Sequence, residues 1–485
     1  MIYYYGFCNN KGYGDNEMKE KTKIKRESSC LPKGFYKTAF SLAIPIALQN
    51  LLTSSGSLVD TIMVIGLGNT KLSAIGLAGR LMFLFNVACF GFCSGGATMF
   101  SQYWGAGDRK NVRRTFCTAL TAIMIFGLIF ALAMFCAPSF LMRIFTNDPV
   151  KAALGAECVR IYAFGIIFIA FSQIGCAALR ATEKVSVPLI ASAISVLVNT
   201  CLNYIMINGK LGFPRMELRG AALATVISAA VQAIIVLLFI IFSDNAIKSK
   251  IEDFRSLSKE FFLKYFRIAS PVILNEVMWA VGTNIYVIIL ASMGDDNYAG
   301  YTIYESVQQL LFVFFVGICH SSAIIVGKYV GDGKHREAFA AAKRFLVMVP
   351  LMGLLMGVII TFTRGPLLSI MPVETESARA VASSLLLIYG YWLVVRMIPY
   401  TAICGIFRAG GDTKTGCYFE ILAIYVLGIP AAYICRSLGA SFVLTVFAIF
   451  FAEDVVKGSL CLYRFFSKKW IKQITDVPPE EVFPE

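Results

Sequence analysis

The sequence predicts an all-α integral membrane protein with twelve transmembrane helices in two six-helix lobes that are related by internal duplication. Two observations support this fold class. The first is composition, because 57% of the 485 residues are hydrophobic and only 15% are charged, whereas a soluble domain has about 25% charged residues. The second is an internal repeat, since residues 45–107 align with residues 271–333 without a gap.

The repeat rests on residues that control backbone geometry. Pro45 matches Pro271, and proline kinks a helix, while glycine allows a close backbone approach. The other matched pairs are Gly56/Gly282, Gly68/Gly294, Gly91/Gly317, Cys93/Cys319, Ala97/Ala323, Tyr103/Tyr329, Gly105/Gly331 and Gly107/Gly333. Duplicated membrane halves are typical of transporters, whose sites lie in or between the halves.

Twelve apolar segments are each long enough to cross a bilayer core of about 30 Å. They are 37–66, 73–104, 116–145, 155–181, 187–207, 220–242, 262–293, 299–330, 340–364, 380–407, 415–435 and 439–464. The predicted parts of the chain are an N-terminal tail 1–35, an N-lobe 36–243, a linker 244–261, a C-lobe 262–466 and a C-terminal tail 467–485. Within the first tail, Met1 and Met18 both remain open as the start.

The net charge of +14 is distributed as a topology signal. Most lysines and arginines lie in the two tails and in every second loop, including 105–114, 243–267 and 328–344. Cytoplasmic loops carry such an excess, so we expect a multi-pass protein of the plasma membrane with both termini in the cytoplasm. The charge does not indicate nucleic-acid binding. The expected partners are the lipid bilayer and small organic molecules, and we expect a monomer.

The sequence does not indicate an enzyme or a cofactor. An enzyme needs a clustered nucleophile, base or metal site. The chain has only His320 and His335, and its cysteines are scattered singly. An integral-membrane enzyme is therefore the weakest alternative.

Two carboxylates inside the spans are the leading functional candidates. Asp60 lies toward the outer half of the first span and Glu276 near the middle of the seventh. A charge at such depth costs roughly 2.5–3.5 kcal/mol on insertion scales and marks function by default. The repeat places Tyr286 opposite Asp60 and Asn50 opposite Glu276, so neither charge is duplicated. Asp60 could instead be a structural hydrogen-bonding group, and Glu276 could be the partner of Arg396.

Other charged residues allow two interpretations each. Arg80 and Glu305 could reach an interface by snorkelling. Arg396 could contact substrate or act as an internal counter-ion. Three more acids, Glu420, Glu453 and Asp454, are expected nearer the ends of their spans.

Asn199 and Asn203, four residues apart, share a helix face. Their carbonyl oxygens can bind a hard cation, although asparagine also forms interhelical hydrogen bonds in membranes. Aromatic residues could line a cavity for flat or cationic compounds, or simply pack. These are Tyr162, Trp279, Tyr286, Tyr389, Tyr391, Trp392 and Tyr400.

Several motifs together resemble the multidrug and toxic compound extrusion (MATE) transporters over about residues 36–466. They are Pro45 with Gln49, the run from Val59 to Val64 with Gly66 and Gly68, Asn199 with Asn203, the run from Gly220 to Thr225, Leu274 to Glu276, and Phe407 to Lys414. The resemblance implies a V-shaped antiporter of twelve helices that exports organic, often cationic drugs in exchange for sodium ions or protons.

The resemblance also assigns roles to residues. Asp60 matches the acid of the N-lobe cation site, with Asn199 and Asn203 as its partners and Thr225 as a further one. A coupling Na⁺ would then bind at Asp60, Asn199 and Asn203, and a coupling proton at Asp60. Some members carry Asp where this chain has Asn203.

In the C-lobe, Glu276 matches the family's seventh-helix acid. The remaining candidates for substrate or proton binding there are Trp279, Tyr286, Arg396 and Tyr400. Some members have an acid in helix 10, about where Ile398 and Pro399 stand here. The alternative within the wider superfamily is a lipid-linked oligosaccharide flippase. It would need a strongly cationic central cavity, for which only Arg80 and Arg396 are candidates.

Overall fold

The computed structural model describes residues 34–255, 257–371 and 375–480. Regular structure within these ranges is helical, apart from one β-bridge between Gly411 and Ile471. The predicted all-α class is therefore confirmed. The alternative starts Met1 and Met18 lie outside the described residues.

Six long helices form the N-lobe, as predicted. They are α2 (Phe35–Ile65), α3 (Asn69–Gly105), α4 (Arg109–Cys136), α6 (Pro149–Ala181), α7 (Ser186–Asn208) and α8 (Glu217–Phe242). The short α5 (Pro138–Arg143) precedes α6, and α9 (Ile251–Arg255) lies in the linker.

The C-lobe also contains six membrane-length segments, but the last three include π-helical turns. The continuous helices are α10 (Lys259–Ala291), α11 (Asp295–Gly331) and α12 (His335–Ile370). The interrupted segments are α13 (Glu376–Tyr400) with η1 (Thr401–Phe407), α14 (Thr413–Ile421) with η2 (Leu422–Gly428) and α15 (Ile429–Ser437), and α16 (Phe442–Phe450) with η3 (Phe451–Val455) and α17 (Val456–Phe466). Such π-turns are frequent at functional sites.

Eleven described segments are long and apolar enough to cross a membrane. The twelfth, from Phe442 to Phe466, is also long but carries Glu453, Asp454 and Lys457 near its middle. Its length and its position in the repeat identify this segment as the last span. Its three charged residues form ion pairs inside the C-lobe.

Side-chain caps set several helix starts outside the membrane spans. Asp108 accepts from the Asn111 backbone N–H at 3.0 Å at the start of α4. At the start of α6, Asp148 accepts from the Lys151 and Val150 backbone N–H groups. These bonds favour the carboxylate and hold the pKa of Asp148 below its ordinary value. The caps therefore fix where the chain turns back into a span.

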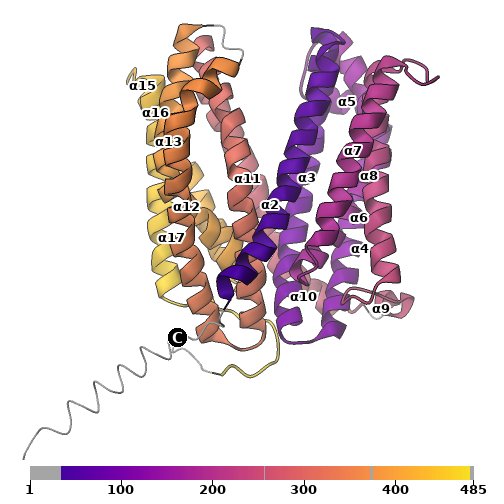
Figure 1. Ribbon diagram of the computed structural model, residues 1–485, viewed down its shortest axis with the longest axis vertical. Coiled ribbons are helices and arrows are strands. Elements are labelled where there is room, and N and C mark those ends of the chain that lie inside the picture. The colour runs from indigo at the N-terminus through magenta and orange to yellow at the C-terminus, as the bar shows by residue number, and fades with distance from the viewer. Residues whose placement is uncertain (1–33, 256, 372–374, 481–485) are drawn as a thin grey trace, which may run out of the picture.

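The two lobes converge at one end and splay apart at the other (Figure 1). We call the converging end, where α2 begins and α3 and α11 end, the closed end, and the other the open end. Gly91 and Gly317 lie on the contact between the lobes. A Cβ at Gly91 would lie 2.7 Å from the Ile273 Cα, and one at Gly317 would lie 2.6 Å from the Ala43 oxygen and 2.9 Å from the Ala47 Cβ.

These contacts follow the repeat, because the 226-residue shift that maps Gly91 onto Gly317 also maps Ala47 onto Ile273. Closer to the closed end, a Cβ added at Gly105 would clash with the Lys328 carbonyl oxygen. A Cβ at Gly331, the equivalent position in the second repeat, would clash with the Gln102 carbonyl oxygen. The matched glycines of the sequence thus lie where the halves touch across their pseudo-two-fold axis.

Each lobe has its own hydrophobic core, and each core includes part of the other lobe's first helix. Phe35 and Ile46 of α2 pack into the C-lobe core. Tyr265 and Ala269 of α10 pack into the N-lobe core. The start of each repeat is therefore shared between the lobes, which joins them at the closed end.

Candidate functional site

A carboxylate and two amides form a polar cluster between α2 and α7 in the N-lobe. The Asn203 amide donates to Asp60 Oδ1 at 2.7 Å and to Asn199 Oδ1 at 3.2 Å. In the other orientation of its amide, Asn199 instead donates to Asp60 Oδ2 at 3.3 Å, and the bond from Asn203 to Asn199 Oδ1 is lost. Both asparagines are buried and Asp60 is half-buried. The structure thus brings together the three residues that the sequence singled out.

Close packing of α2 on α7 positions this cluster. One turn before Asp60, a Cβ at Gly56 would meet a Val196 methyl at 3.1 Å, so glycine keeps the helices close. Asn203 Oδ1 is buried and has no hydrogen-bond partner among the described residues. The hydroxyl of Thr225 donates within its own helix, to the Ala221 carbonyl at 3.0 Å, so no hydrogen bond joins it to Asp60.

Glu276 pairs with an arginine that lies just beyond the predicted span 380–407. Arg408 donates to Glu276 Oε1 at 2.7 Å and to Ser94 Oγ at 3.2 Å. Arg408 is only 3% exposed. The partner of Glu276 is therefore Arg408 and not Arg396, and this pair also contacts α3 of the N-lobe.

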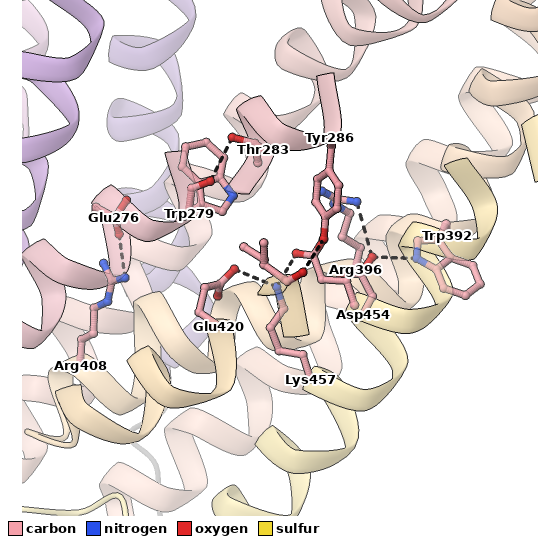
Figure 2. A network of polar contacts seen from close by, with 12 residues as sticks. Glu276, Trp279, Thr283, Tyr286, Trp392, Arg396, Arg408, Glu420, Asp454 and Lys457 are labelled. Atoms are coloured by element: carbon pink, nitrogen blue, oxygen red, sulfur yellow. Dashed lines mark hydrogen bonds and ion pairs between the residues drawn. The ribbon is translucent and has the colours of Figure 1, made fainter. Parts of the chain in front are cut away.

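A second group of buried charges lies deeper in the C-lobe (Figure 2). Lys457 donates to Glu453 at 2.9 Å and to Glu420 at 3.1 Å. Beside it, Asp454 accepts from the Trp392 indole at 2.8 Å and lies 3.5 Å from Arg396. We call these residues, including Arg396, the C-lobe charge network.

Three acids that are expected nearer the ends of their spans are buried inside the lobe. Glu420, Glu453 and Asp454 are each less than a tenth exposed. Glu453 and Asp454 are in the π-helical η3, at the middle of the last span. Lys457 is not among the residues that the sequence singles out, since a lysine that follows an apolar run fits a topology signal equally well.

The other C-lobe candidates differ in their surroundings. Tyr286 is buried and donates to the Ile424 carbonyl at 3.4 Å, pointing toward the C-lobe charge network (Figure 2). Arg396 belongs to that network and also lies 4.9 Å over the Phe450 ring. Tyr400 packs on Phe312 with 4.7 Å between ring centroids. Trp279 is more than a third exposed.

The remaining candidates include both exposed and packed residues. Arg80 is exposed and Glu305 half-buried. Of the aromatics, Tyr162 and Tyr389 are buried and Tyr391 is exposed.

A pocket between the lobes lies next to the Glu276–Arg408 pair. Its lining includes Ser94 of α3, Arg180 of α6, His320 of α11 and Arg408. The His320 ring meets the edge of Phe90, another lining residue, at 6.1 Å. Arg180-Ala181 and Arg408-Ala409 stand at corresponding places in the two halves of the sequence, but the sequence does not predict that the two arginines face a common space.

The fold and these intramembrane polar sites define a two-lobed membrane transporter and not an enzyme. The MatE family model matches residues 45–205 and 271–434, one segment in each lobe. The chain therefore belongs to the MatE family of MATE transporters, as its motifs indicated.

Known proteins resemble the chain along most of its length. The probable multidrug resistance protein NorM of Thermotoga maritima is 25% identical over 441 residues, covering 90% of this chain and 93% of that protein. The multidrug resistance protein MdtK of Pectobacterium atrosepticum is 22% identical over 401 residues, covering 81% of this chain and 86% of that protein.

Solved structures share the fold. A MATE protein in complex with MaL6 superposes with a TM-score of 0.80 at 20% identity, covering 90% of this chain and 98% of that one. An outward-facing multidrug resistance MATE transporter gives a TM-score of 0.80 at 20% identity, covering 89% and 95%.

Proposed function

We propose that the protein is a cation-coupled antiporter that exports organic, drug-like compounds, including cationic ones, by alternating access. The observation that carries this proposal is the Asp60 cluster, where one carboxylate lies beside two buried amides. The similarity of the chain to multidrug resistance proteins supports the proposed class of substrate. The same similarity and the MatE match favour this function over a lipid-linked oligosaccharide flippase.

The Asp60 cluster offers ligands for either coupling ion. Asp60 supplies one negative charge, and Asn203 Oδ1 is an acceptor without a partner in the described part of the chain. Carboxylate and amide oxygens suit a hard cation such as Na⁺. A proton on Asp60 would instead convert the carboxylate into a donor toward Asn199 Oδ1. Both forms remove the negative charge of Asp60, which is the state change that transport requires.

The charge distribution supports an orientation in the plasma membrane. The basic loops that follow α3 and α11 lie at the closed end together with the start of α2. Under the positive-inside rule this end faces the cytoplasm. The lobes then open toward the outside of the cell, which is the orientation from which an exporter releases its substrate. The proposed functional unit is a monomer.

Glu276 supports the export of cations through its ion pair. A substrate ammonium can replace the Arg408 guanidinium as the partner of Glu276, because both are cationic donors for a carboxylate. After such an exchange Glu276 would be compensated by the substrate, and Arg408 would need another anionic partner.

The test is ethidium efflux from proteoliposomes with sodium and pH gradients imposed separately. The Asp60→Asn protein should lose gradient-driven efflux, since a neutral amide cannot change charge on ion binding. The control is Asp295→Asn at the exposed start of α11, which should retain wild-type rates. Undiminished gradient-driven efflux by the Asp60→Asn protein would refute the assignment, and the gradient that drives the wild type identifies the ion.

A further inference from the structure

The pocket between the lobes receives an arginine from each half of the repeat. Arg180 lies in the last turn of α6, and Arg408 directly follows η1. Both side chains line the pocket. Because their motifs are matched in the duplicated sequence, the pseudo-two-fold relation of the lobes directs two guanidinium groups toward one space. Neither arginine is among the central charges that the sequence predicts, which are Arg80 and Arg396.

The two arginines differ in how their charges are compensated. Arg408 is balanced by Glu276 at 2.7 Å. Arg180 donates to the neutral Gln49 amide oxygen at 3.2 Å and forms no ion pair with a described residue. The pocket therefore holds one guanidinium charge in excess.

The groups around Arg180 are suited to an anion. Ser94, Thr98 and Gln173 also line the pocket. The Thr98 hydroxyl donates to the Ser94 carbonyl and the Gln173 amide to Asn86, which leaves the Ser94 hydroxyl and the second amide N–H of Gln173 as donors. A guanidinium offers a planar pair of N–H donors that matches a carboxylate or a similar oxyanion. His320 contributes a further polar ring to the same lining. The positive charge and these donors together form a binding site for a small anionic group.

We propose that this pocket binds the anionic group, a carboxylate or sulfonate, of an organic substrate. The proposal rests on the proposed export function and deepens it, since it names the substrate class. Glu276 contacts the Arg408 guanidinium at 2.7 Å, so a compound that carries both charges can satisfy both partners. The ammonium replaces Arg408 at Glu276, and the anionic group compensates Arg180 and the released Arg408. Amphoteric compounds are therefore the best-matched substrates.

Rhodamine B and its methyl ester test this proposal, because they share one cationic ring system and differ in a single carboxylate. Binding of each dye to the purified full-length protein in detergent is measured by fluorescence polarisation. The wild type should bind the acid more tightly than the ester. Arg180→Gln should weaken binding of the acid about tenfold, as the loss of one charged hydrogen bond predicts, and leave binding of the ester unchanged. Arg180→Lys should retain part of the preference.

The control is Arg160→Gln, which removes an exposed arginine from the same helix and should change neither affinity. Equal binding of acid and ester by the wild type, or an unchanged preference in Arg180→Gln, overturns the proposal. The first comparison needs no variant, so a misfolded mutant cannot leave the question open. If inorganic phosphate at dye concentrations abolishes the preference, the pocket is a site for free anions and the substrate assignment is wrong. Binding in detergent does not depend on coupling, so a failure of the proposed antiport is detected separately.

Discussion

Lys457 compensates two buried carboxylates at once. It donates to Glu420 and to Glu453, and all three residues are less than a tenth exposed. The desolvation of such a group can exceed the attraction within it, so the intact group contributes little net stability. Removing only the cation is different, because it leaves two negative charges facing each other in the lobe interior.

We therefore expect Lys457→Met to lower the free energy of unfolding by about 3–5 kcal/mol, as for other broken buried ion pairs. The measurement is the thermal unfolding midpoint of the purified protein in detergent. Adding Glu420→Gln and Glu453→Gln to the same variant should restore much of the loss, since no charge is then uncompensated. Lys414→Met, at an exposed position, serves as the control. A Lys457→Met midpoint equal to that of the control would show that the charges are solvated.

The N-lobe cluster could be predicted from single residues, whereas the C-lobe charge network could not. The spacing of Asn199 and Asn203 alone places them on one helix face. Asp60 is an acid within a span, so the excess of basic residues that marks cytoplasmic loops cannot account for it. Lys457 and Arg408 each follow an apolar run, where a basic residue is expected at a cytoplasmic end. Only the packing of their helices reveals that both are buried.

At the scale of the helices, the inter-lobe contacts depend on the absence of side chains. The sequence predicted that the matched glycines had a backbone role. It could not predict that α2 and α10 are each shared between the two cores, because hydrophobic periodicity does not specify which neighbour a helix contacts. The contact of Gly91 with Ile273, repeated as Gly317 with Ala47, shows the role of these glycines.

Gly91→Ala tests this close approach. Alanine in a helix normally stabilises by roughly 0.5–1 kcal/mol relative to glycine. At Gly91 the added Cβ would lie 2.7 Å from the Ile273 Cα, and such overpacking costs about 1–3 kcal/mol. The clash should therefore win, and the unfolding midpoint should fall. Gly79→Ala, in the same helix with open space around it, should keep or raise the midpoint. A rise in both variants would contradict the packing role.

At the scale of the whole molecule, the chain after α17 ties the halves together at the closed end. We call residues 473–480 the C-terminal strap. The Ile474 backbone N–H donates to Gln102 Oε1 of α3 at 2.8 Å, and its carbonyl accepts from Lys264 of α10 at 3.0 Å. Thr475 donates to the Gly331 carbonyl at 2.7 Å, at the end of α11. The strap thus contacts three helices whose ends must separate if the closed end opens.

Truncation after Lys472 should shift the population toward a form that is open at the present closed end. It removes the three hydrogen bonds above and two more, between His335 and Gln473 at 3.0 Å and from the Glu480 N–H to the Gly333 carbonyl at 3.1 Å. Each contributes about 1 kcal/mol, and a change of about 1.4 kcal/mol alters a two-state ratio tenfold. It keeps the buried Trp470 in place. Spin labels on Leu211→Cys and Leu438→Cys, at exposed loops of the two lobes at the open end, report the change in a background without native cysteines. Their distance distribution should gain a shorter component as the open end closes, whereas a chain ending at Glu480 should behave as the full-length protein. An unchanged distribution in the Lys472 truncation would mean that the glycine contacts of α3 and α11 hold the closed end without the strap.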